Sequence, residues 1–487
     1  MRCSNVPTSQ AEAGTEQIRR FKELLTDHPQ FRRSWIGSTI SMLGSRTIGV
    51  TYPLLGYELT DSPAWIGWVM FASTVPALVA HIPAGAIIDW LGPRRVMFWS
   101  EVLRGVLIAG LCLLLLAGEM RVEYLVAIAL VEGTLSAHSS VAETALIPTT
   151  VKPDDVERAL AVHEGSVHSM VLTGRPLGGL LFGIAPIVSF GANAAMFFSA
   201  ALILRRREPD ITASVPRKER LLRQIGAGVV ELWRDPFLRW ATLVTAFINL
   251  MVQGLIMIFL AEAADDGLPA FLMGTILAVS GIGGVVGALI FPKRRDIWGQ
   301  LGARAYKRSR GDWHIEWWRR RVPGPSTMRA HLWSCAVALL LPLVFLASSP
   351  VFAVSLLLIG LTGGLSNVTM RRALSQVPTD RVARVVGVSR LATHSAVAIG
   401  PLLASLLVQC AGSVYALAAL AVPTVAAAVL MTFVPALRTA LTSSGVEPES
   451  ATPAPPAVAL PPAAPQAASP PAAPHTATQP AAPRHTA

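Results

Sequence analysis

The chain has few charged residues. Only 15% of its 487 residues are Asp, Glu, Lys or Arg, whereas soluble domains average about 25%. At the same time, 52% of the residues are hydrophobic, which is more apolar surface than one soluble domain can bury. The composition therefore excludes an ordinary soluble protein and predicts that much of the chain faces lipid.

Cysteine is scarce, and several functional motifs are missing. The four cysteines, Cys3, Cys112, Cys335 and Cys410, lie too far apart for a disulfide framework or a zinc site. No Gly-Lys dipeptide occurs, so a Walker A phosphate loop is absent and ATP cannot drive the protein through that motif. No G-x-S-x-G nucleophile motif occurs either. We therefore expect a protein that is not an enzyme and that uses no cofactor, metal or ATP.

The sequence also lacks the marks of a cleaved leader. The segment before residue 30 is polar and contains no apolar core followed by a cleavage site, so we expect it to stay attached. The net charge of +11 would suggest nucleic-acid binding on a soluble chain, but on a membrane chain it is typical of cytoplasmic loops. The expected partner is the lipid bilayer and not nucleic acid.

Twelve apolar stretches are long enough to cross a bilayer, which takes about 20 residues. They lie at residues 34–57, 65–88, 96–117, 123–147, 159–183, 186–204, 237–261, 269–292, 329–348, 350–370, 383–409 and 413–436. The stretches at 186–204 and 329–348 are short, so their edges are the least well defined. The predicted fold class is an all-α polytopic membrane protein with twelve transmembrane helices.

Basic residues gather on one side of these predicted spans. That side carries Arg32 and Arg33, Arg94 and Arg95, Lys152 and Arg158, Arg205 to Arg207, Arg217 to Arg223, residues 293–321, and Arg371 to Arg384. The other side carries Arg121 among Glu58, Asp61, Glu119, Glu123, Glu262, Asp265 and Asp266. By the positive-inside rule, both termini are expected in the cytoplasm, with the spans in the inner (plasma) membrane of a bacterium.

The composition predicts five parts. They are a cytoplasmic segment 1–33, a six-helix bundle 34–204, a cytoplasmic linker 205–236, a second six-helix bundle 237–437 and a tail 438–487. The tail is rich in Pro and Ala and is expected to be disordered, with a linker-like role favoured over targeting or partner binding. The loop 293–328 mixes Trp with Lys and Arg, which is typical of a segment on an anionic inner leaflet. Nucleic-acid binding and an ordinary loop are its alternatives.

An internal repeat relates the two bundles. Residues 154–181 align without a gap with residues 380–407. Identical pairs include Asp154 with Asp380, Arg158 with Arg384, His168 with His394, Ser169 with Ser395, and Gly174 with Gly400. The fifth predicted helix thus corresponds to the eleventh, which predicts two parallel six-helix repeats.

The loop between the second and third predicted helices carries a recognisable motif. The segment from Gly85 to Arg95 is similar to the pattern G-x-x-x-D-R-x-G-R-R. Gly85, Asp89, Gly92 and Arg94 match its positions and Arg95 follows directly, although Trp90 and Pro93 replace residues that are usually basic. With the repeat, this motif resembles the major facilitator superfamily. The residues around Pro53 and Pro63, together with Gly174 to Gly179, resemble its drug:proton antiporter branch, which includes macrolide and enterobactin exporters.

The resemblance implies a cytoplasmic gate at this motif. In that family the carboxylate at the position of Asp89 holds the cytoplasmic side closed, and Gly85 permits close backbone approach. We therefore expect Gly85, Asp89, Gly92, Arg94 and Arg95 to form the gate. A helix-end charge tied only to Arg94 or Arg95 is the alternative.

Arg46 and Glu132 lie near the middle of the first and fourth predicted helices. Charges at that depth are costly and are usually functional or paired. Because the resemblance implies that these helices line the central cavity, we expect Arg46 to pair with Glu132, which takes up a proton when the pair opens. A purely structural ion pair is the alternative.

Other polar residues complete the predicted site. Glu101, Arg104 and Glu143 are expected to brace the helices, because Glu101 and Arg104 share one helix face. The expected cavity consists of Arg46, Glu132, His168, Arg175, Asn249, Gln253 and Asn367. His168 and Arg175 lie on one stripe with Glu164, which is close enough to the cytoplasm to be merely solvated. Interhelical hydrogen bonding is the alternative for the neutral side chains.

These features favour a monomeric secondary transporter that exports small amphipathic compounds, drugs or natural products such as siderophores, by alternating access coupled to protons. One alternative is a facilitator or importer on the same fold, in which Arg46 and Arg175 bind an anionic nutrient. The other is a membrane scaffold or sensor that acts through the basic loop and the tail.

Overall fold

The structure is a computed structural model that describes residues 19, 21–205, 221–290, 327–345, 347–375, 377 and 379–434. Contacts divide the chain into Met1–Leu441 and Thr442–Ala487, and all described residues belong to the first unit. The predicted tail, and the predicted basic loop up to residue 326, lie outside the described residues. The elements of the described part are helices.

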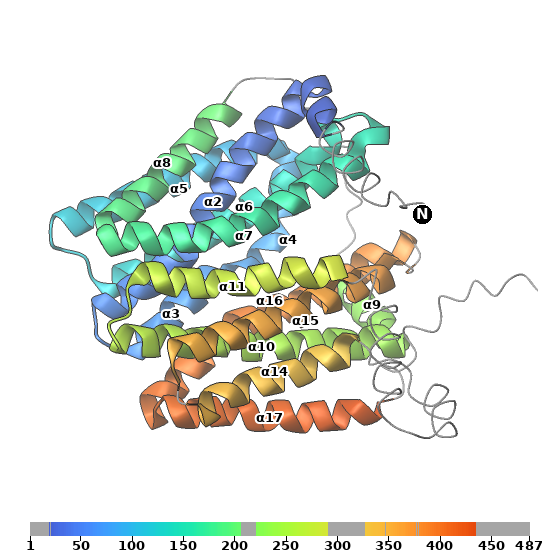
Figure 1. The fold of residues 1–487 in the computed structure, drawn as a ribbon. Helices are drawn as coiled ribbons and strands as arrows, with labels where there is room; N and C mark the ends of the chain where they lie inside the picture. The colour runs from blue at the N-terminus through green and yellow to red at the C-terminus, as the bar shows by residue number, and fades with distance from the viewer. Residues whose placement is uncertain are drawn as a thin grey trace, which may run out of the picture. The chain divides into compact units, whose positions relative to one another are not determined.

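The first half of the chain folds into helices that match the first six predicted spans (Figure 1). They are α2 (Pro29–Glu58), α3 (Pro63–Thr74), α4 (Pro76–Leu91), α5 (Pro93–Leu116), α6 (Val122–Thr150), the short 3-10 helix η1 (Pro153–Asp155), α7 (Val156–Ile184) and α8 (Pro186–Leu204). Many begin at a proline, whose fixed φ and missing N–H suit the first turn of a helix. Pro76 also divides the second span into α3 and α4, since it cannot donate a hydrogen bond to the preceding turn.

The second half repeats this pattern. Its helices are α9 (Leu221–Arg234), α10 (Pro236–Asp265), α11 (Ala270–Ile290), α14 (Thr327–Val344), α15 (Ser349–Ser375), α16 (Thr379–Ala411) and α17 (Ser413–Phe433). The helix α9 was not predicted, because it lies in the segment interpreted as a linker. Its apolar residues follow helical spacing, and Leu232 is buried against α16, the helix on which α9 packs.

Ten of the described helical segments are long and apolar enough to cross a membrane. The other two predicted spans are α2 and α7, which are long enough but carry more polar residues, Arg46 and Arg175 among them. This arrangement confirms the predicted class, an all-helical polytopic membrane protein built from two six-helix repeats. Membrane-spanning helices satisfy all of their backbone hydrogen bonds internally, as a lipid environment demands.

The first half contains a buried core of its own, and the core of the second half also takes in Val50, Leu54 and Ile66 of the first. Tyr52, Ile108 and Phe197 are fully buried in the first half, and Phe259 and Phe352 are fully buried in the second. The halves meet along two seams, one between α7 and α11 and the other between α3 and α16. Figure 1 shows α7 beside α11 along most of their length.

The ends of successive helices lie at two opposite ends of the helical assembly. At the end that we call basic, Arg94 at the start of α5 donates to the Leu204 carbonyl at the end of α8. At the end that we call acidic, Tyr57 at the end of α2 donates to Asp265 at the end of α10. Arg94 and Leu204 thus lie at one end of the described helices, and Tyr57 and Asp265 lie at the other.

Candidate functional site

A buried cluster of charged residues lies inside the first half. Arg104 on α5 is 1% exposed, and it contacts Glu101, one turn earlier on the same helix, and Glu132 on α6. Its Nη1 lies 3.1 Å from Glu101 Oε1, and its Nη2 lies 2.6 Å from Glu132 Oε1. The Nε atom also donates to Glu132 Oε1 at 2.9 Å. Two carboxylates therefore share one guanidinium group.

Neutral groups complete this cluster. Arg104 donates to Ser41 Oγ at 3.0 Å and to Ser45 Oγ at 2.6 Å, and both serines belong to α2. Ser139 on α6 donates to Glu101 Oε1 at 2.7 Å. The guanidinium carbon lies 3.9 Å from the centre of the Phe197 ring on α8, a cation–π contact. Helices α2, α5, α6 and α8 therefore meet around Arg104, and hydrogen bonds satisfy the buried charges.

The predicted pair of Arg46 with Glu132 is wrong, because Arg104 is the partner of Glu132. Arg46 lies on the face of α2 that packs against α7 at Gly174. Glu143 was expected to brace the cluster, but it lies beside His163 on α7, with His163 Nδ1 3.2 Å from Glu143 Oε1. The predicted contact between Glu101 and Arg104 is present.

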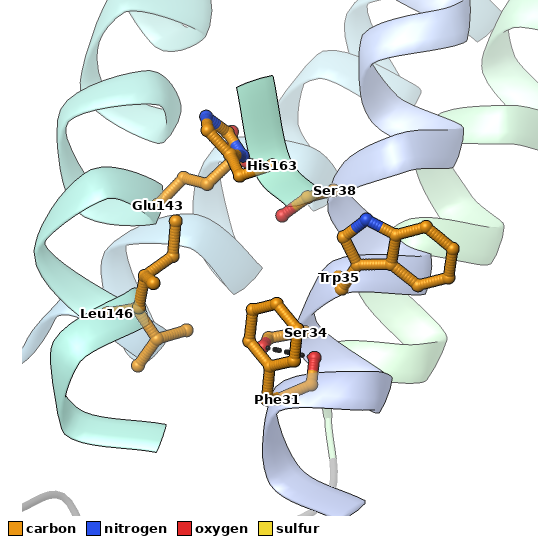
Figure 2. A pocket seen from close by; sticks show the side chains of 8 residues that line it. Phe31, Ser34, Trp35, Ser38, Glu143, Leu146 and His163 are labelled. Atoms are coloured by element: carbon orange, nitrogen blue, oxygen red, sulfur yellow. Dashed lines mark hydrogen bonds and ion pairs between the residues drawn. The ribbon is translucent and has the colours of Figure 1, made fainter. Parts of the chain in front are cut away.

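Glu143 and His163 line a small pocket at the basic end of the first half (Figure 2). The pocket has a volume of about 10 Å³, which is room for one water molecule. Its other walls are residues of α2 and α6, namely Phe31, Ser34, Trp35, Ser38, Leu146 and Ile147. Figure 2 shows His163 and Glu143 side by side, facing these α2 residues across the pocket. The pocket is too small for a drug-sized compound.

Arg46 lies where α2 packs against α7, and Arg175 lies where α7 packs against α11. Arg175 on α7 donates from Nη1 to the Leu277 carbonyl at 2.8 Å and to Ser280 Oγ at 3.2 Å, and both acceptors belong to α11 in the other half. The Nε atom of Arg46 is buried without a hydrogen-bond partner in the described part of the chain. Their neighbours are therefore neutral groups.

Glu164 joins the two halves near the basic end. It accepts a hydrogen bond from Arg371 on α15, and His168 Nε2 lies 3.3 Å from its Oε1. Arg371 is therefore the partner of Glu164 in the other half. His168 is more than half exposed, so its side chain is accessible.

The predicted gate is only partly described. Gly85 and Asp89 lie on α4, but their side-chain surroundings lie outside the described residues. Gly92, between α4 and α5, has a φ of 85°, a left-handed conformation that favours glycine. Arg94 anchors the start of α5 to the end of α8, and Arg95 follows it on α5.

The neutral candidates lie apart from the buried cluster. Asn249 on α10 donates to the Thr245 carbonyl of its own helix at 2.8 Å. The Cβ of Gln253 lies 3.1 Å from the position that a Cβ would take at Gly400 on α16. Asn367 on α15 is exposed. Sequence reasoning missed Ser41 and Ser45, whose spacing of four residues on α2 was a usable signal.

The described residues contain no group of three or more His, Cys, Asp or Glu side chains that could hold a metal ion. Two repeated six-helix halves, with charged groups buried between membrane-spanning helices, define the molecule as a polytopic membrane protein of the secondary-transporter class.

The chain belongs to the Major Facilitator Superfamily, whose family model matches residues 34–306. It is 27% identical over 410 residues to the multidrug efflux pump Tap of Mycolicibacterium fortuitum, which covers 80% of this chain and 91% of that protein. It is 25% identical over 272 residues to the enterobactin exporter EntS of Shigella dysenteriae, and this match covers 55% of this chain and 64% of the exporter.

The fold also matches solved transporters. The crystal structure of the nucleoside transporter NupG aligns with a TM-score of 0.60 at 12% identity, covering 82% of this chain and 99% of that one. This likeness concerns the fold alone. Together with the family match, it confirms a transporter rather than an enzyme.

Proposed function

We propose that the protein exports small amphipathic compounds by alternating access and that protons drive the export. The multidrug pump and the enterobactin exporter among its relatives support the direction and the kind of substrate. The observation that carries the coupling is the buried cluster in which Glu101 and Glu132 share Arg104.

The charge balance of this cluster suits a proton carrier. With both carboxylates ionised, the cluster has one more negative than positive charge. One proton on either carboxylate balances the guanidinium charge, and a neutral set is far less costly inside a membrane protein. The serines around the cluster can hydrogen-bond to either state, because a hydroxyl both donates and accepts. We therefore place proton coupling on Glu132 and Glu101, with Arg104 as their partner, and no longer on a contact of Glu132 with Arg46.

Movement of the halves supplies the alternating access. At the acidic end, the contact of Tyr57 with Asp265 joins the halves, and a Cβ at Gly179 would lie 2.1 Å from the Ala270 carbonyl oxygen. At the basic end, the pair of Glu164 with Arg371 joins them. Each set must separate when that end opens. We propose that the basic end faces the cytoplasm and that Asp89 and its motif help to close it.

The substrate path follows the seam between the halves. Arg175 reaches α11 across that seam, and Arg46 lies beside α7. Of the other proposed cavity residues, the exposed His168 and Asn367 are accessible to a ligand, while Asn249 and Gln253 lie on α10. We propose these residues as polar contacts for the substrate, with the bundles at 34–204 and 237–437 as the moving units.

Accumulation of fluorescent lipophilic compounds in expressing cells tests the proposal. Export predicts lower accumulation than in control cells, and a protonophore is expected to restore it. Glu132→Gln is expected to abolish the difference, whereas Glu123→Gln, at an exposed position of the same helix, is expected to preserve it. Protonophore-insensitive export by the wild type, or full activity of Glu132→Gln, would contradict the proposed coupling.

A further inference from the structure

Two arginines inside the helical assembly have no carboxylate partner in the described part of the chain. Ion pairs among the described residues use other basic residues, namely Arg19, His28, Arg104, Arg158, His163, His168, Arg234, Arg371 and Arg381. Arg46 leaves a buried Nε without a hydrogen-bond acceptor. Arg175 has only a carbonyl and a hydroxyl as acceptors. Both are therefore cations among neutral groups.

The carboxylates of the neighbouring helices are already engaged. Glu101 and Glu132 contact Arg104, Glu143 contacts His163, and Glu164 contacts Arg371. The sequences of α11, α14, α15 and α17 contain no Asp or Glu. Within the described residues, Arg46 and Arg175 therefore form no ion pair with a carboxylate.

The two arginines are neighbours. A Cβ at Gly174, the residue before Arg175, would lie 2.5 Å from the Cβ of Arg46. Arg175 lies on the seam between the two halves, where α7 meets α11, and Arg46 lies beside it on α2, which packs against α7.

Adjacent cations of like sign inside a membrane protein are costly, and such charges are usually paired or functional. A guanidinium group matches an oxyanion in geometry and charge, since it presents several N–H donors in one plane. We propose that Arg46 and Arg175 together bind an oxyanion, a carboxylate or a group of comparable charge, on the transported compound. This inference rests on the proposed transport function and names its substrate class: amphipathic anions.

Binding at this place has a mechanical consequence. The Nη1 of Arg175 holds the Leu277 carbonyl and the Ser280 hydroxyl on α11. An anion that takes these N–H donors competes with both acceptors. It therefore weakens one link across the α7–α11 seam, so substrate binding favours separation of the halves there.

A matched pair of probes tests the proposal, a dansyl fatty acid and its methyl ester, which differ mainly in charge. Each is titrated against the full chain in nanodiscs of neutral lipid, with empty nanodiscs subtracted. The wild type is expected to bind the acid at least about tenfold more tightly than the ester, as hydrogen bonds to a charged group imply. Arg46→Gln and Arg175→Gln are expected to lose that preference while keeping their affinity for the ester.

Three variants serve as controls. Arg121→Gln removes an exposed arginine outside the site and is expected to keep the preference. Arg46→Lys and Arg175→Lys keep the positive charge and are expected to retain part of the preference for the acid. These two variants also keep the test informative if a Gln variant fails to fold. Equal affinity of the wild type for acid and ester would overturn the proposal, and so would an undiminished preference in both Gln variants.

Transport of the ester in the same membranes separates this inference from the proposed function. Gradient-dependent export of the ester without any acid preference would leave proton-driven export standing and would overturn the anion site. An acid preference without transport of either probe would support the anion site and would count against the exporter.

Discussion

Replacing Arg104 by Gln is the most informative single perturbation of the buried cluster. The change keeps most of the side-chain volume but removes the positive charge that Glu101 and Glu132 share at 3.1 Å and 2.6 Å. It also removes the donors to Ser41 and Ser45. Breaking a buried ion pair from one side costs about 3–5 kcal/mol, because the remaining charge is left unpaired. We expect a loss of stability in that range for Arg104→Gln.

The assay is thermal unfolding of the purified protein in detergent, measured beside a triple variant in which Glu101, Arg104 and Glu132 are all replaced by Gln. The triple variant leaves no unpaired charge, so we expect it to lose less stability than Arg104→Gln alone. The reasoning would be refuted if Arg104→Gln were as stable as the wild type. It would also be refuted if the triple variant were as unstable as the single one.

Two further predictions concern the seam and the basic end. Gly179→Val places a Cβ against the backbone of Ala270, so we expect reduced transport. We also expect a cysteine introduced at the acidic end to react faster with a thiol reagent. Gly183→Val, whose Cβ has room, is expected to change neither transport nor this reactivity. His28 donates from Nε2 to Asp155 at 3.0 Å, and this hydrogen bond, with nearby positive charges, lowers the pKa of Asp155. A carboxyl group whose pKa is lowered on folding stabilises the fold at any pH above its ordinary pKa. This stabilisation is lost as the pH falls through the lowered pKa. Asp155→Asn is therefore expected to be less stable than the wild type at neutral pH, and the difference is expected to vanish in strong acid; a difference that persisted there would count against the ionised carboxylate.

The spans could be predicted because their signal is local. Apolar runs of bilayer length marked the helices, and prolines such as Pro93 and Pro186 stand at the first helical residue. The second span was predicted as one stretch, 65–88, whereas the structure divides it into α3 and α4 at Pro76, which has no N–H to donate to the preceding turn. The helix α9 was not predicted, because charged residues surround its short apolar stripe.

The pairing inside the helices could not be predicted in the same way. Position along the chain gives an approximate depth, but a side-chain contact depends on the rotation of each helix and on its neighbours. Arg46 and Arg104 were both available to Glu132, and packing of α2 on α7 at Gly174 turns Arg46 away. The contact of Glu101 with Arg104 could be predicted, because the two residues lie within one helical turn.

The central claim is that a proton carried on the buried carboxylates crosses the membrane in exchange for the exported compound. Its most direct test uses liposomes that contain the purified protein and an internal pH dye, with a pH gradient imposed and a transported lipophilic compound added. The wild type is predicted to dissipate the gradient faster when the compound is present, and the variant carrying both Glu101→Gln and Glu132→Gln is predicted to show no such acceleration. Equal acceleration by the two proteins would contradict the role given to these carboxylates.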